Sequence, residues 1–156
     1  MFEDVYLAIK WVHILSATLL FGMGLGSAFY MLMASLSKKQ PIVRHTLTHV
    51  VRADWFVTTP TVIIQFVSGM MLVSIGGHSL NELWLKWALV LFVFTGACWL
   101  PVVWLQIKML NTVKTCAEED SLPSIYWFYN RWWLGLGILA FPTVAVIFYL
   151  MVFKPA

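Results

Sequence analysis

Hydrophobic residues are concentrated in four long stretches, and the short segments between them hold most of the charged residues. The stretches cover approximately residues 5–36, 55–75, 83–110 and 127–153. About twenty consecutive apolar residues cross a bilayer as a helix, whereas membrane strands would alternate polar and apolar residues. Helices also satisfy all their own backbone hydrogen bonds in lipid. The pattern predicts an all-α fold, a four-helix transmembrane bundle that forms a single domain over residues 1–156.

Composition separates this chain from ordinary soluble domains. Hydrophobic residues make up 61% of the 156 residues, and charged residues make up only 11%. The net charge of +3 comes from basic residues that flank the apolar stretches instead of forming one continuous basic face. We therefore expect contacts with the headgroups of the lipid bilayer and no binding of nucleic acid. We also expect a homo-oligomer or a subunit of a larger membrane complex.

Lysine and arginine are unevenly distributed between the two ends of the predicted bundle. Seven flank the first and third connecting segments: Lys38, Lys39, Arg44, Arg52, Lys108, Lys114 and Arg131. Three lie at the other end: Lys10, Lys86 and Lys154. Basic loops stay in the cytoplasm, so this distribution predicts both termini on the outer side of the membrane, which for a bacterial inner membrane is the periplasm. The acidic N-terminus does not fit a cleaved signal peptide, so we expect the first stretch to remain in the mature protein.

His13 is the residue of greatest functional interest, because it lies inside the first apolar stretch. An imidazole in hydrocarbon is costly unless it has a partner, which makes it a candidate functional residue. Three roles are open to it: haem axial ligand, ligand of another metal, or proton carrier. The alternative without a ligand is a histidine that is hydrogen-bonded to a neighbouring helix.

Several side chains are expected on the same, outer side of the membrane as His13. They are Met70, Met71, His78, Trp84 and Lys86. A second histidine or a methionine would complete a six-coordinate haem with His13, and Lys86 could pair with a propionate. Methionine also fills gaps between helices and lysine also extends to the headgroups, so packing and anchoring are the alternative roles for these side chains.

The first connecting segment begins with Pro41 and carries His45 and His49 one helical turn apart. This spacing permits metal binding, but the catalytic glutamate of a metalloprotease motif is absent between the two histidines. We therefore favour a short basic amphipathic helix that lies on the inner membrane surface.

The apolar stretches contain few other reactive groups. No nucleophile motif and no phosphate-binding glycine loop is present, and the four stretches lack Asp and Glu. This absence argues against an ion-coupled transporter of the carboxylate-bearing type. Gly22 and Gly26 have the spacing that allows two membrane helices to approach closely.

Several sequence segments resemble known membrane proteins. Residues 6–16, which include His13, resemble the start of HemJ-type protoporphyrinogen oxidases and of CopD-like copper-resistance proteins. Further similar segments are residues 52–69, residues 84–86, Tyr129-Asn130, Pro142 and Lys154-Pro155. Nearly the whole chain most closely resembles a four-span family of predicted integral membrane proteins, domain of unknown function 2269, which is distantly HemJ-like.

The resemblance implies a b-type haem with His13 as its axial ligand, Lys86 beside a propionate, and a redox or electron-transfer role. The HemJ pattern also has an arginine late in the first helix, where this chain has none, and an acidic residue where it has Arg131. These departures argue against protoporphyrinogen oxidase activity and remain compatible with haem binding. The alternative is a non-catalytic membrane protein that handles copper through His13, Met70 and Met71, or an assembly subunit without a cofactor.

Overall fold

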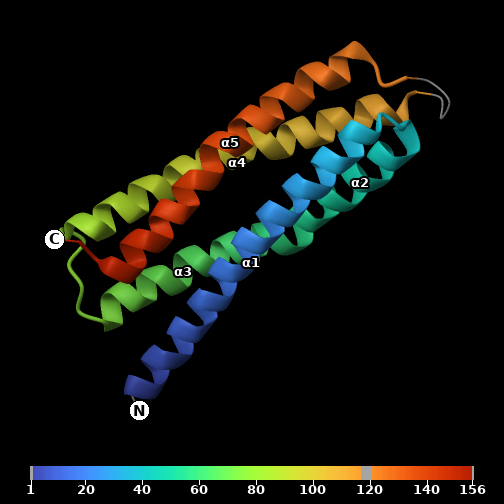
Figure 1. Ribbon diagram of the computed structural model, residues 1–156. Helices are drawn as coiled ribbons and strands as arrows, with labels where there is room; N and C mark the ends of the chain where they lie inside the picture. Colours follow the sequence, from blue (N-terminus) through green and yellow to red (C-terminus); the bar gives the residue numbers. More distant parts are fainter. Residues whose placement is uncertain (1, 117–120, 156) are drawn as a thin grey trace.

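The computed structural model describes residues 2–116 and 121–155, and this part of the chain is helical without strands. The helices in chain order are α1 (Phe2–Ser37), α2 (Gln40–Ala53), η1 (a π-helix, Asp54–Thr58), α3 (Thr59–Ile75), α4 (Leu83–Lys114) and α5 (Ser124–Phe153) (Figure 1). α2, η1 and α3 form one continuous helix, so four helices are long and apolar enough to cross a membrane. The predicted all-α, four-span fold is confirmed.

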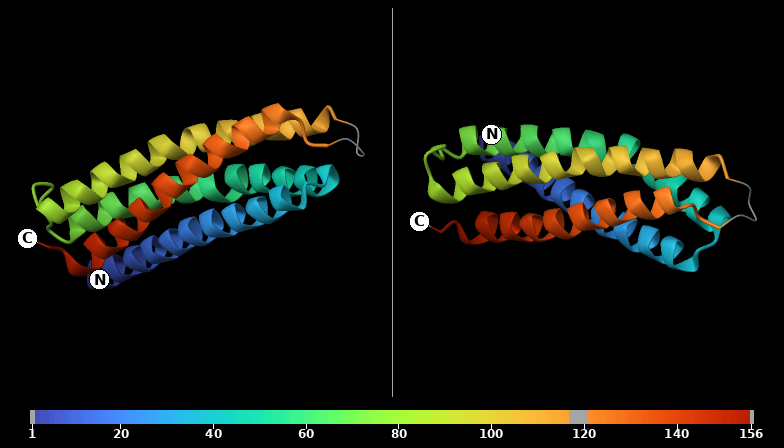
Figure 2. Two further views of the ribbon diagram at one scale, coloured as in Figure 1. Left: turned by 45° about the horizontal axis from the view of Figure 1, so that its top comes forward. Right: turned by 90° about the horizontal axis from the view of Figure 1, so that it is seen from above.

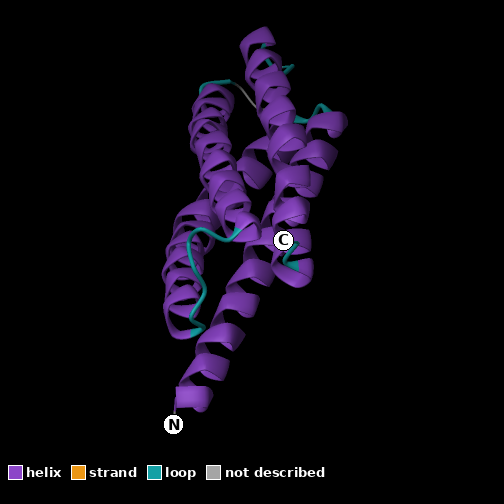
Figure 3. Ribbon diagram, turned by 90° about the vertical axis from the view of Figure 1, so that its left-hand side faces the viewer, coloured by secondary structure: helices purple, strands orange, loops and turns teal. Residues whose placement is uncertain are grey.

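The helices run antiparallel and give the bundle two distinct ends (Figures 1 and 2). Both termini and the α3–α4 loop lie at one end, which we call the terminal end. The α1–α2 turn, the last turn of α4 and the first turn of α5 lie at the other, which we call the basic end. α4 and α5 pack along each other, while α1 packs mainly against α2 and α3. Towards the terminal end α1 diverges from the α4–α5 pair (Figure 3).

The first connecting segment forms α2, but the expected position of this helix on the membrane surface is wrong. The structure does not place it apart on the membrane surface, because α2 packs against α1 and α4 and continues through η1 into α3. Its apolar face buries Val43, Leu47 and Val50, which follow one another at helical spacing. These side chains find partners inside the bundle, so the second long helix begins well before the predicted boundary at residue 55.

Hydrophobic side chains form two buried clusters, one at each end. The large cluster at the basic end, which we call the basic-end core, comprises Met31, Ala34, Val43, Leu47, Val50, Leu105, Met109, Leu110, Val113, Leu122, Tyr126 and Trp133. The small cluster at the terminal end comprises Trp84, Leu85, Ala88 and Leu150. Between them the buried side chains, Cys98 apart, are polar: Ser16, Asp54, Thr58, Thr61, Ser68 and Gln106. The middle of the bundle therefore directs polar groups inward and apolar groups outward.

Close helix approach occurs at a different glycine from the one that the sequence suggested. A Cβ atom at Gly22 or Gly26 would meet nothing within 4 Å among the described residues, so neither glycine marks a close helix approach there. A Cβ at Gly69 of α3 would lie 3.1 Å from Cε1 of His13. The missing side chain of Gly69 thus allows α1 to bring its histidine against α3.

Candidate functional site

His13 of α1 faces α3, and both of its ring nitrogens have a partner there. Nδ1 lies 2.9 Å from Oγ of Ser68, and Nε2 lies 3.1 Å from the side-chain nitrogen of Gln65. The Ser68 hydroxyl donates its own proton to the carbonyl of Ile64 at 2.6 Å. Oγ of Ser68 must therefore accept from His13, and Nε2 of His13 must accept from Gln65. With the Gln65 amide in this orientation, the contacts fit an imidazole that carries its proton on Nδ1.

Ser16, one turn after His13, completes this network. Its hydroxyl donates to Oε1 of Gln65 and also lies 2.9 Å from the carbonyl oxygen of His13. A hydroxyl has one proton, so these two acceptors are alternatives. Ser16 and Ser68 are buried, and the network joins α1 to α3 within the apolar part of both helices. We call His13, Ser16, Gln65 and Ser68 the His13 network.

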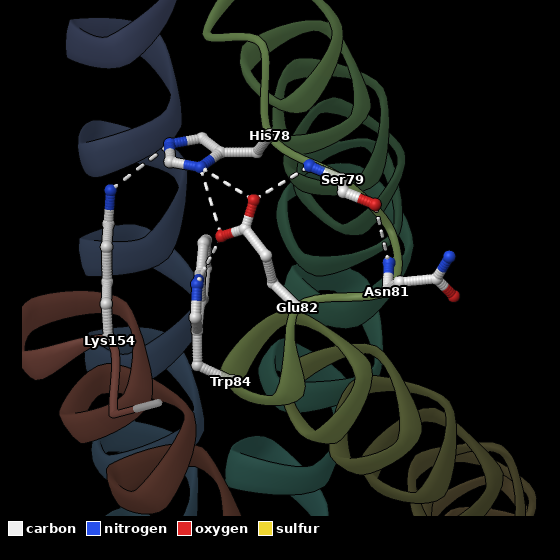
Figure 4. A network of polar contacts seen from close by, with 6 residues as sticks. All are labelled: His78, Ser79, Asn81, Glu82, Trp84 and Lys154. Carbon is white, nitrogen blue, oxygen red and sulfur yellow. Dashed lines mark hydrogen bonds and ion pairs between the residues drawn. The ribbon is translucent and has the colours of Figure 1, made fainter.

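His78 and Trp84 lie together at the terminal end (Figure 4). Glu82 accepts hydrogen bonds from the backbone N–H of Ser79 and from the indole N–H of Trp84, each at 2.7 Å, and from Nδ1 of His78 at 3.2 Å. Nζ of Lys154 lies 3.3 Å from Nε2 of His78 and 5.1 Å from the centroid of the Trp84 ring. These contacts, which we call the terminal clasp, attach the end of α5 to the α3–α4 loop.

The hydrogen bonds of the clasp also change the acidity of Glu82. The backbone N–H of Ser79, followed by the indole N–H of Trp84, holds the pKa of this carboxyl below its ordinary value. His78 adds a smaller contribution through its hydrogen bond and charge. The clasp therefore favours the ionised form of Glu82.

The remaining predicted site residues do not join His13. Lys86 is exposed in the first turn of α4, Met71 is exposed on α3 and Met70 is half-buried. Within residues 2–116 and 121–155, no hydrogen bond, ion pair or ring contact joins any of these three to His13. Of the six predicted residues, the structure brings together only His78 and Trp84.

The predicted pairing of His45 and His49 on one helical face is confirmed, with ring centroids 4.5 Å apart. Both residues are exposed on α2. The described residues contain no group of three or more His, Cys, Asp and Glu that could hold a metal ion.

Asp54 is a candidate that sequence reasoning missed. The predicted second span started at residue 55, which left this carboxyl in the connecting segment. In the structure Asp54 belongs to η1 within the long helix and is only 8% exposed. Thr58, Gln106 and Trp99 present their polar groups to its carboxyl. The expectation of spans without a carboxylate is therefore wrong for the second long helix, which continues through Asp54 and buries it.

Polar residues follow one face of the long helix from Asp54 onward. Asp54, Thr58, Thr61, Gln65 and Ser68 are separated by four, three, four and three residues, which is the spacing of a single helical face. Four are buried and Gln65 is half-buried. At helical rise this polar seam is about 20 Å long. It links the Asp54 region to the His13 network along one helix, and its spacing was the sequence signal that could have revealed Asp54.

Comparison with known proteins places the chain among membrane proteins. The model of the family DUF2269, described as a predicted integral membrane protein, matches residues 7–155. The chain belongs to this family. No curated protein and no solved structure matches it. The predicted resemblance to DUF2269 is confirmed, and the distant likeness to HemJ-type and CopD-like proteins stays a prediction.

In this DUF2269 protein, the hydrogen bonds of His13 do not fit a role as a haem or copper ligand in the observed conformation. A metal needs a free ring nitrogen, whereas Nδ1 is bonded to Ser68 and Nε2 to Gln65. Gly69 also lies against the ring edge. Binding of haem b or copper at His13 stays a prediction that requires the imidazole to leave one of its partners on α3.

Proposed function

We propose that this membrane protein transfers protons and that His13 is the group that binds them. The observation that carries the proposal is the His13 network, in which each ring nitrogen has a polar partner on α3 within hydrogen-bond distance. Imidazole exchanges protons near neutral pH more readily than any other unperturbed side chain. A histidine surrounded by hydrogen-bonding groups inside a membrane bundle is typical of a proton relay.

The network can serve both protonation states. In the neutral state the Ser16 hydroxyl donates to Gln65, whose amide N–H donates to Nε2 of His13. When a proton binds Nε2, rotation of the Gln65 amide turns its oxygen to the imidazolium and its N–H to Ser16. The Ser16 hydroxyl then turns to the carbonyl of His13, 2.9 Å away. Each group keeps a partner, which lowers the cost of charging an imidazole in apolar surroundings.

The polar seam supports transfer along the bundle. It extends from the partners of His13 towards the basic end over about 20 Å, a large part of a hydrocarbon core about 30 Å thick. Hydroxyl and amide groups on one inward face can hold chains of water through which protons move. In the orientation that the positive-inside rule favours, His13 is on the periplasmic side of an inner membrane and Asp54 on the cytoplasmic side.

Proton flux into proteoliposomes tests the proposal. Purified protein is reconstituted with an enclosed pH-sensitive dye, and a valinomycin-induced potassium potential drives proton entry. We expect entry well above that of protein-free vesicles and its reduction by about tenfold or more in His13→Gln, the range that loss of a proton-transfer group typically gives. His45→Gln is the matched control, because His45 is exposed on α2. Equal rates in the wild type and His13→Gln, or no flux in either, would overturn the proposal.

The same samples separate proton transfer from the haem and copper hypotheses. An axial imidazole would produce a Soret band that sharpens into α and β bands on reduction with dithionite. A Soret band present in the wild type and absent from His13→Gln would replace proton transfer with a haem-dependent redox role. Bound copper that is lost in the same variant would favour copper handling. Our proposal expects neither.

A further inference from the structure

Asp54 occupies a position where the packing predicts an apolar side chain. It continues the face of α2 that buries Leu47 and Val50. The helix also widens here into the π-turn η1, and Oγ1 of Thr59 donates to the Asp54 carbonyl at 2.8 Å. π-turns inside α-helices are rare and occur frequently at functional sites. A buried carboxyl in such a turn therefore indicates a chemical role.

The carboxyl is surrounded by polar groups that are not satisfied. Thr58, Gln106 and Trp99 present their side chains to it. Even so, Oδ2 of Asp54, Oε1 of Gln106 and Nε1 of Trp99 are buried without a hydrogen-bond partner among the described residues. Asp54 and Gln106 are 8% and 3% exposed. Buried polar atoms are almost always paired, so three unpaired atoms around one carboxyl indicate a small polar ligand.

The unpaired atoms define the chemistry of that ligand. Two of them, on Asp54 and Gln106, are acceptors, and the Trp99 indole N–H is a donor. A water molecule donates twice and accepts once, so it complements all three atoms. A bare metal cation would be held by the two oxygens, but the Trp99 N–H directs a positive hydrogen at the same place. The set of atoms therefore favours a neutral water molecule over a metal ion or a hydronium ion, since neither cation accepts a hydrogen bond from Trp99.

No basic side chain neutralises the carboxyl within the described part of the chain. Arg52 of α2 and Lys108 of α4 are the basic residues nearest to this cluster in sequence, and both are exposed. Nζ of Lys108 lies 5.4 Å from the centroid of the Trp104 ring. No ion pair joins Asp54 to either of them. A proton that binds Asp54 therefore does not have to displace a basic partner among the described residues.

We propose that Asp54, Gln106 and Trp99 hold a water molecule that passes protons to Asp54, towards the basic end of the polar seam. In the loading step one O–H bond of this water breaks as an O–H bond forms at Oδ2 of Asp54, and the water regains a proton from a hydronium ion that reaches it through further water. The products are a neutral carboxylic acid, the bound water held by Gln106 and Trp99, and one water molecule left from the hydronium ion. The step moves one proton and no electrons. The inference rests on the proposed proton transfer for its purpose, but the site itself can be tested without any flux.

Infrared difference spectroscopy tests the site on the whole protein in lipid nanodiscs. Changing the pH over the range in which the protein stays folded should reveal a carboxylic-acid C=O band. We expect this band to be absent from Asp54→Asn and retained in Glu3→Gln, a control carboxyl that is exposed at the start of α1. It should change frequency in Gln106→Leu, which removes an acceptor of the bound water. Exchange into water labelled with oxygen-18 should shift an O–H band that Gln106→Leu abolishes.

The outcomes separate the site from the proposed function. If Asp54→Asn removes no band, or if sodium ions displace the band at constant pH, the proposed water site with a proton-accepting Asp54 is wrong. A band that titrates in a protein without proton flux would confirm the site and overturn the proposed function. Proton flux in a protein whose Asp54 does not titrate would support the proposed function and overturn the site. Asn is close to Asp in shape, and gel filtration of Asp54→Asn verifies that its fold is retained.

Discussion

The basic end and the middle of the bundle are stabilised in different ways. At the basic end Met31, Leu47, Met109 and Tyr126 have no exposed surface, as in the core of a soluble protein. In the middle the buried side chains are mostly polar, and large apolar ones such as Phe56 face outward. Apolar burial is strongly favourable in water but gains little in lipid, where the tails are equally apolar. The basic-end core lies among charged residues such as Arg52 and Lys108, which indicates that this end projects towards water.

The difference between the two regions shows where a four-helix membrane protein can bury polar side chains. Helices that do not need apolar contacts with each other can meet through hydrogen bonds and glycine, as α1 and α3 do at His13 and Gly69. The basic-end core, which lies outside the middle of the bundle, stabilises the packing of the same helices. The apolar packing that stabilises the fold therefore does not depend on the middle, where titratable groups lie.

The largest expected effect concerns the basic-end core. Leu47→Ala removes a fully buried side chain and leaves a cavity, so we expect a loss of about 2–5 kcal/mol in the free energy of unfolding. Phe56→Ala changes a side chain that is 80% exposed, and we expect a change of about 0.5 kcal/mol or less. Reversible unfolding in mixed micelles measures both. Equal losses would show that the two regions are stabilised alike.

A smaller effect is expected at the glycine contact of the middle. Gly69→Val places side-chain atoms against the His13 ring, and such overpacking costs about 1–3 kcal/mol. Gly22→Val is the control, because a Cβ there meets nothing within 4 Å. Unfolding measurements compare the two, and a spin-label distance between α1 and α3 reports their separation. An unchanged distance and stability in Gly69→Val would contradict the close approach.

The smallest expected effect is the pH dependence of the terminal clasp. The pKa of Glu82 is lowered by its hydrogen bonds from Ser79 and Trp84, so the unfolded chain binds a proton more readily than the folded one. The stabilisation is therefore complete above the unfolded pKa and is lost as the pH falls through the folded pKa, in the acid range. Acid titration of tryptophan fluorescence should show this transition, and Glu82→Gln should remove it. A transition that persists in Glu82→Gln would assign it to another group.

Part of the candidate site could be read from the sequence. His13 stood out because it is polar within an apolar stretch, and its alternative role as a partner of a neighbouring helix describes the observed contacts with Ser68 and Gln65. The proposed grouping of His13 with Lys86 and the methionines assumed that equal depth brings residues together. Residues at the same depth in the membrane can face different directions, because each helix can rotate about its own axis. In the structure His13 faces α3.

The sequence by itself determined the four helices and their place in a membrane. Insertion depends on the length and transfer free energy of each segment, which are local properties. Only the tertiary structure decided that α2 belongs to the bundle, that Asp54 is buried opposite Gln106 and Trp99, and that Gly69 rather than Gly22 permits close approach. These features depend on which faces of distant helices meet. That choice comes from contacts between residues far apart in the chain, and no local pattern contains it.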